Sequence, residues 1–160
     1  ADCVVAAAVG YGQLAWEIQQ NPKVVILDRT NIRHLTGELV GDPIDLVVAD
    51  LSFISLTLVL PALAAVSKPE ADYVLMVKPQ FEVGRERLGA GGVVRDPALR
   101  KAAVLEVAES AYDVGLGTLG VTASPLPGPA GNVEYFLWLR RGAPAIDEAA
   151  LDRAIEIGPQ

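Results

Sequence analysis

Cysteine is nearly absent from this chain, with Cys3 as the single one among 160 residues. A lone thiol cannot form an internal disulfide, which favours a reducing, cytoplasmic setting. Cys3 lies in an apolar run, where a thiol is most simply a small buried hydrophobe. Histidine is as rare, with His34 alone, and no spacing of metal ligands is visible, so we infer no metal.

Long hydrophobic runs and basic residues are also scarce. No apolar run approaches the roughly 18 residues of a membrane span, and no signal peptide is visible. The chain has 13 Lys and Arg against 20 Asp and Glu, a formal net charge of −7. Nucleic-acid-binding modules usually present a basic patch, because contacts with phosphates supply most of their affinity. Composition alone therefore argues against an autonomous RNA- or DNA-binding module.

Apolar residues are abundant, at 51% of the chain, which argues against disorder. We expect one domain over residues 1–142 and a tail helix within residues 143–160. Apolar runs alternating with helical patterns predict an α/β fold, a doubly wound and mostly parallel sheet with helices on both faces. The last strand should be antiparallel, because the turn before it is too short for a crossover helix. The predicted strands are residues 3–9, 24–27, 45–50, 73–77, 119–124 and 133–140, and the predicted helices are residues 13–20, 55–66, 97–114 and 144–157.

Three ionisable residues lie at or near the ends of predicted strands. Asp50 follows a strand that reads as buried on both faces, Lys78 follows the next strand, and Glu134 lies in the apolar last strand. Ligands of open α/β sheets bind beyond the carboxyl ends of the strands, so these residues are candidates for catalysis. Simpler interpretations remain open: Asp50 as a cap and Lys78 as a solvated strand end. Glu134 fits a structural role least well, because buried carboxylates are rarely unpaired.

The front of the chain gives a weaker signal. Gly10-Tyr11-Gly12 follows the first strand, but a simple strand-to-helix turn is favoured over a cofactor loop, since no third glycine follows at the right offset. In a nucleoside site, the strand that follows the glycine-rich cofactor turn ends in an acid that holds the ribose hydroxyls. Here that glycine-rich turn would precede residues 3–9. Ala8 occupies the position where that acid would fall.

Four motifs carry a family likeness, namely VADLSFISL at residues 48–56, VKPQFEVG at 77–84, GGVVRDP at 91–97 and SPLPGPAGNVEYFLWLR at 124–140. With VGYGQL at 9–14 and RTNIR at 29–33, they resemble the TlyA, or haemolysin A-like, ribosomal RNA methyltransferases over nearly the whole chain up to Arg141.

The resemblance implies an FtsJ-like, S-adenosylmethionine-dependent enzyme of Rossmann type that methylates a ribose 2′-hydroxyl of ribosomal RNA. It implies that Lys78 is the general base, oriented by the carboxylates Asp50 and Glu134. The cofactor would be bound by five residues, namely Val9, Thr30, Asn31, Asp50 and Leu51.

The resemblance also implies parts that this chain lacks. A first catalytic lysine, the glycine-rich motif for S-adenosylmethionine and an S4-like RNA-binding domain would lie upstream of Ala1. The chain then reads as the C-terminal portion of such an enzyme, inactive alone and without its first strand. That strand would lie between the strands at residues 3–9 and 45–50.

Two other functions stay open at this point. Ala8 and the missing front favour a non-catalytic remnant that binds RNA, the ribosome or a protein. A membrane-lytic haemolysin, as the family's older name suggests, lacks any membrane-active segment. The glycine-rich loop at residues 79–94 is either a lid facing RNA or an ordered surface loop.

Overall fold

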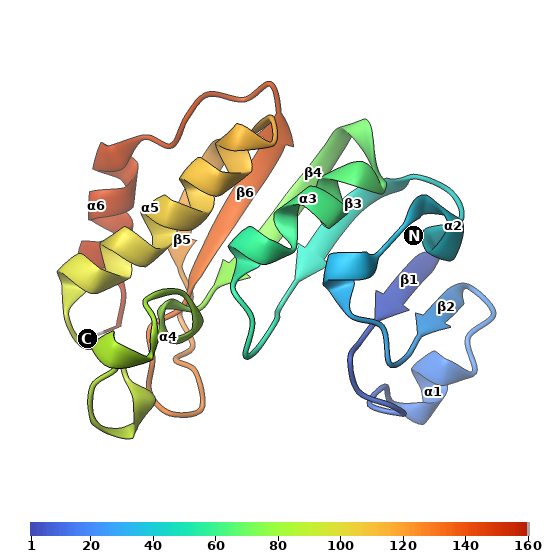
Figure 1. Ribbon diagram of the computed structural model, residues 1–160, viewed down its shortest axis with the longest axis horizontal. Helices are drawn as coiled ribbons and strands as arrows, with labels where there is room; N and C mark the ends of the chain where they lie inside the picture. The colour runs from blue at the N-terminus through green and yellow to red at the C-terminus, as the bar shows by residue number, and fades with distance from the viewer. Residues whose placement is uncertain (160) are drawn as a thin grey trace.

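The computed structural model describes residues 1–159 (Figure 1). Its strands are β1 (Val4–Ala7), β2 (Val24–Leu27), β3 (Ile44–Ala49), β4 (Ser67–Val77), β5 (Leu116–Ala123) and β6 (Tyr135–Arg141). Its α-helices are α1 (Trp16–Gln19), α2 (Gly37–Val40), α3 (Leu60–Ala65), α4 (Pro79–Glu82), α5 (Pro97–Asp113) and α6 (Glu148–Ile157). Short 3₁₀ helices are η1 (Ile32–His34), η2 (Leu56–Leu58), η3 (Arg85–Arg87) and η4 (Ala90–Gly92).

The strands form two separate sheets. A four-stranded sheet has the order β3-β4-β6-β5, and β1 pairs with β2 alone. The β1–β2 and β3–β4 pairs are parallel, whereas β6 runs antiparallel to both β4 and β5. This arrangement confirms the predicted α/β class and the antiparallel last strand.

The facing edges of the two sheets are not paired with each other. Among residues 1–159, β1 and β3 each have a single partner strand. On β3, Leu46 and Val48 are 55% and 72% exposed, although both are apolar. The break between β1 and β3 lies where the family resemblance predicts a further strand.

One face of the four-stranded sheet forms the main core. Along β4 and β6, alternate residues such as Tyr73, Leu75 and Leu137 are at most 1% exposed. Helices α3 and α5 lie over this face and contribute Leu60 and Val107 to the same cluster (Figure 1). Both are crossover connections between parallel strands, which right-handedness places on one side of a sheet.

The second face of this sheet carries the intervening residues. Val74, Met76 and Phe136 are half-buried there, and Trp138 is 45% exposed. Helices α3 and α5 lie over the opposite face, so within the described residues this face is the more exposed of the two. The link from β5 to β6 is a turn and supplies no helix.

Helix α5 begins at Pro97, as predicted, and ends at Asp113, one residue before the predicted end. The side chain of Asp96 accepts a hydrogen bond from the Ala98 amide at 2.8 Å, and Pro97 occupies the first turn. Gly115 follows with φ +87°, a conformation that favours glycine at a helix end.

Two predicted helices differ from those observed. Helix α1 is a single turn without buried residues, and the large apolar side chains of Trp16 and Ile18 are 68% and 45% exposed. The reason is that α1 accompanies a sheet of two strands, which offers little surface to bury it. The predicted helix at residues 55–66 splits into η2 and α3. Pro61 lies in the first turn of α3, where a backbone N–H has no partner within the helix, so its absence in proline costs no hydrogen bond.

The tail contains α6, as predicted. Leu151 and Ile155 of α6 belong to the main core cluster, and Lys101 of α5 makes an ion pair with Asp152 at 2.6 Å. The helix therefore packs on α5 and β5, while the boundary at residue 142 stays a prediction about domain organisation.

Candidate functional site

The carboxyl ends of β3 and β4 bring Asp50 and Lys78 together. The two strands are adjacent and parallel, with Ala49 level with Leu75, so the residues that follow them emerge at one edge. Lys78 Nζ lies 2.6 Å from Asp50 Oδ1 and donates to Ser52 Oγ at 3.2 Å. The Lys78 side chain is 12% exposed and that of Asp50 is 64% exposed. The amine is thus largely withdrawn from water, while the carboxylate faces it.

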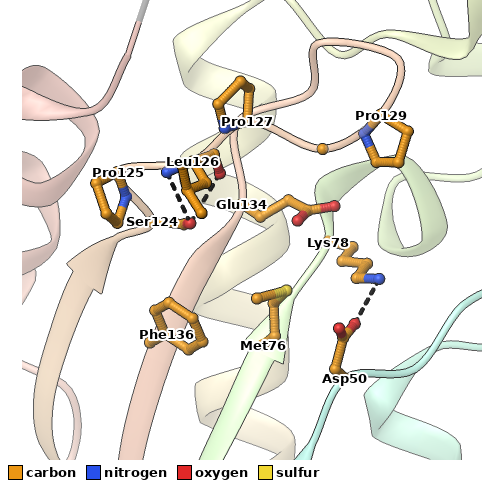
Figure 2. A pocket seen from close by; sticks show the side chains of 11 residues that line it. Asp50, Met76, Lys78, Ser124, Pro125, Leu126, Pro127, Pro129, Glu134 and Phe136 are labelled. Atoms are coloured by element: carbon orange, nitrogen blue, oxygen red, sulfur yellow. Dashed lines mark hydrogen bonds and ion pairs between the residues drawn. The ribbon is translucent and has the colours of Figure 1, made fainter. Parts of the chain in front are cut away.

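Glu134 reaches the same place from the start of β6. It lies one residue before the strand, is 6% exposed, and accepts a hydrogen bond on Oε1 from Gln80 Nε2 at 3.0 Å. Figure 2 shows Asp50, Lys78 and Glu134 around one pocket of about 490 Å³. The other residues lining it are Met76, Phe136 and the segment from Ser124 to Pro129.

The segment that begins at Lys78 makes three separate contacts. Lys78 binds Asp50, Gln80 binds Glu134, and Glu82 binds the start of η2. There Glu82 accepts hydrogen bonds from the Leu56 amide at 2.9 Å and from the Ser55 hydroxyl. Burial raises the pKa of Glu82, and these two hydrogen bonds act in the opposite direction. The segment therefore fixes the loop after Asp50 as well as the two carboxylates of the pocket.

The contacts of Gln80 and Glu82 were not predicted from the sequence. A signal was present in the alternation of polar side chains along VKPQFE, which a short turn can direct to different neighbours. The partners lie 54 residues from Gln80 and 26 from Glu82, so the sequence alone did not identify them.

The proline-rich turn before β6 is held by Asn132. This side chain is 2% exposed, accepts from the Val94 amide at 2.9 Å and donates to the Gly92 carbonyl at 3.1 Å. The glycine-rich loop that begins after β4 is therefore tied, at its far end, to the turn that lines the pocket.

The predicted cofactor residues divide between two places. Asp50 lines the pocket and Leu51 follows it and packs against the main core. Val9, Thr30 and Asn31 lie instead beyond the ends of β1 and β2 and are not among the residues that line the pocket.

Local contacts explain the geometry beyond β1 and β2. The Thr30 amide donates to the Ala8 carbonyl at 2.9 Å, and Val9 is 71% exposed. Asn31 Oδ1 accepts from the Arg33 amide at 3.0 Å and so caps η1. The sequence did not predict this capping role for Asn31.

The Gly10-Tyr11-Gly12 turn is tied to the end of β2. The Gly12 amide donates to Asp28 Oδ2 at 3.2 Å, and the Arg29 amide donates to the Gly10 carbonyl at 3.0 Å. Arg29 also lies over the Tyr11 ring, 4.7 Å from its centroid. At the end of β1, Ala8 offers no side-chain acceptor, and the carboxylate of Asp28 is already engaged.

Phe53 stands out beside the pocket-forming loop. It has φ +63° and is 90% exposed, and its ring lies 5.1 Å from that of Phe81. A bulky residue with positive φ is strained, and such strain concentrates at functional sites. This backbone conformation was not predicted from the sequence.

No group of three or more His, Cys, Asp or Glu side chains in residues 1–159 is arranged to hold a metal ion. None of the helices in that range combines the length and the apolar character that a membrane span requires.

Comparison with known proteins places this geometry in a family. Residues 1–141 match the model of the FtsJ-like methyltransferases. The chain is 57% identical to the 16S/23S rRNA (cytidine-2′-O)-methyltransferase TlyA of Mycobacterium tuberculosis, over 98% of this chain and 60% of that protein. It thus spans about 60% of the length of this curated relative.

Two solved structures are similar throughout. A protein named a hemolysin from Streptococcus thermophilus matches with a TM-score of 0.91 and 33% identity, over 98% of this chain and 57% of the other. One of the same description from Lactococcus lactis matches with a TM-score of 0.87 and 34% identity, over 96% and 76%. The chain belongs to the FtsJ-like methyltransferase family.

Proposed function

We propose that this chain carries the catalytic residues of an S-adenosylmethionine-dependent enzyme that methylates a ribose 2′-hydroxyl of ribosomal RNA. The observation that carries the proposal is the convergence of Asp50, Lys78 and Glu134 on one pocket from three different strands. The name of the Mycobacterium tuberculosis relative supports the substrate and the position of the methyl group.

Methyl transfer requires the protein to remove the proton of the ribose hydroxyl and to align that hydroxyl with the methyl group. A ribose hydroxyl is a poor nucleophile, so a base must take its proton while its oxygen bonds to the methyl carbon and the bond from that carbon to sulfur breaks. Lys78 is the proposed base. An amine accepts a proton only through a free lone pair, so Lys78 acts as a base in its neutral form. Asp50 and Glu134 orient the amine, and the pocket walls align the hydroxyl.

The residues present fit the sulfonium of S-adenosylmethionine better than its ribose. S-adenosylmethionine, when bound, supplies an electrophilic methyl group on a sulfonium. The exposed Asp50 carboxylate suits a positive sulfonium, and Leu51, Val9, Thr30 and Asn31 are the proposed residues on the adenosine side. At the ribose end, Ala8 stands where an acid would accept the hydroxyls.

The partners are proposed on charge and on the relatives. A net charge of −7 provides little attraction for RNA, so we expect an S4-like domain elsewhere in the full-length protein to supply it. A cytoplasmic location remains a prediction, consistent with a ribosomal substrate.

The test compares two lysines at opposite ends of β4, Lys78 just after the strand and Lys68 near its start, in the full-length protein. Lys78→Met should lower methylation of ribosomal RNA by about 10²- to 10⁴-fold, because it removes a positioned base. Lys68→Met is the matched control, since Lys68 also binds a β3 aspartate at 2.6 Å, at the opposite end of the strands. Undiminished methylation by Lys78→Met would refute the assigned role.

Ala8 supports a second candidate, a non-catalytic module that binds RNA, the ribosome or a protein. Titration calorimetry of the full-length protein with S-adenosylmethionine separates the two. Micromolar binding supports the enzyme, whereas no detectable heat at millimolar cofactor supports the binding module.

A further inference from the structure

Glu134 is a buried carboxylate that accepts a hydrogen bond from a neutral side chain. At 6% exposure it is almost removed from water, and no ion pair involves it among residues 1–159. The ion pair of Lys78 is made with Asp50 instead. A buried carboxylate needs hydrogen-bond donors to offset lost hydration. Gln80 Nε2, at 3.0 Å from Oε1, supplies one.

Gly128 lies against the same carboxylate oxygen. A Cβ atom at position 128 would lie 2.7 Å from Glu134 Oε1 and 3.1 Å from Cδ, closer than side chains approach one another. The turn itself is fixed, because the Gly128 amide donates to the Asn132 carbonyl at 2.8 Å. Glu134 is therefore confined on one side by backbone and held on the same oxygen by an amide.

The side-chain amide of Gln80 uses its nitrogen to donate a hydrogen bond to Glu134. Its own oxygen, Oε1, is buried and has no hydrogen-bond partner in the described part of the chain. Leaving an acceptor unsatisfied costs free energy, so this geometry is retained against a local cost. A neutral donor also holds a carboxylate without placing a second cation beside the Lys78 amine.

We propose that Gln80 is a positioning residue of the site: it fixes Glu134 through Oε1 and leaves the other carboxylate oxygen to act in the pocket with Lys78. This inference rests on the proposed methyl transfer and adds a residue that acts through Glu134 without touching the substrate. Gly128 contributes to the same positioning, because its lack of a side chain leaves room for the Glu134 carboxylate.

The experiment uses the full-length protein with three substitutions. Gln80→Met keeps the length of the side chain and removes the donor, and Gln80→Glu replaces the donor with a second carboxylate. Gln20→Met, at the exposed end of α1, is the control. Methylation of ribosomal RNA is measured over pH 6–9, together with KM for RNA, cofactor affinity and the melting temperature.

We expect Gln80→Met to lower kcat by about ten- to a hundredfold, as misplaced catalytic groups do. KM, cofactor affinity and melting temperature should stay close to those of Gln20→Met. Gln80→Glu should be impaired more strongly at high pH than at low pH, because one proton shared between the two carboxyl groups restores a hydrogen bond.

The outcomes separate this inference from the proposed function. If Lys78→Met abolishes methylation while Gln80→Met keeps the wild-type kcat and pH profile, the role of Gln80 is refuted and the base assignment stands. If Lys78→Met remains fully active, the proposed function fails, and the inference fails with it. A crystal structure of Gln80→Met gives a readout without activity: an unmoved Glu134 carboxylate would also overturn the positioning role.

Discussion

The two sheets of this protein are stabilised to different degrees. In the four-stranded sheet, residues such as Leu75, Leu137 and Leu139 are fully buried beneath α3 and α5. In residues 1–40 the buried apolar residues are Ile32 and Val40, whereas Val4, Val9 and Trp16 are largely exposed. The proposed catalytic residues belong to the first region, and most of the proposed cofactor residues belong to the second.

This difference indicates that the two halves of the site are formed in different ways. Asp50 follows β3 and Lys78 follows β4, while Glu134 precedes β6, and β4 pairs with both of the other strands, so the packing of this chain fixes their separation. Val9, Thr30 and Asn31 follow a pair of short strands with little core beneath them. We infer that the catalytic side is preorganised by this chain, and that the cofactor side depends on further contacts.

The largest expected effect tests the packing contrast directly. In the full-length protein, Leu137→Ala should lower the free energy of unfolding by about 2–5 kcal/mol, because it opens a cavity beneath the helices. Val4→Ala should cost about 0.5–1 kcal/mol, since the side chain is 46% exposed. Urea denaturation of both variants checks this. Equal costs would show that additional contacts cover β1.

A second prediction concerns the missing acid at the end of β1. Ala8→Asp should strengthen the binding of S-adenosylmethionine by about tenfold, because a hydrogen bond to a charged group contributes about 1.5–3 kcal/mol. Titration calorimetry measures the change, and Ala15→Asp, on the exposed start of α1, is the control. Unchanged or weaker binding would show that the cofactor's ribose does not lie at Ala8.

The smallest effect concerns Glu82, which links the segment after β4 to the loop after Asp50. Its pKa is raised by burial, so the folded state holds the proton more tightly than the unfolded state. The resulting contribution to stability is present below the ordinary glutamate value of about 4.3 and is lost as pH rises through the raised value.

Glu82→Gln should remove this pH dependence, so the stability of the wild type should decline relative to the variant as pH rises above about 4.3. The urea midpoint as a function of pH measures the difference, with the exposed Glu17→Gln as the control. Parallel curves for the wild type and Glu82→Gln would contradict the assignment.

Much of this arrangement could be predicted from the sequence, because periodicity and strand order are local signals. Asp96-Pro97 predicted the start of α5, and the short link before residue 133 predicted an antiparallel β6. Asp50 and Lys78 could be placed together because neighbouring parallel strands end at one edge.

What the sequence could not supply depends on distant partners or on how much surface is available. Ile18 lies four residues after Leu14, the spacing of one helix face, and is nevertheless 45% exposed, because the adjoining sheet has two strands. The contacts of Gln80 and Glu82 join segments far apart in the chain. The positive φ of Phe53 follows from the loop as a whole and has no local signature.

The break between β1 and β3 has a consequence for motion. No backbone hydrogen bond joins these strands within residues 1–159, so the front pair can open without disrupting the ladder of the larger sheet. Amide exchange should then report two rates, fast at residues 4–7 and 24–27 and slow along β6. A small molecule that contacts the ends of both sheets would slow amide exchange in β1 and β2 and leave the exchange of β6 unchanged.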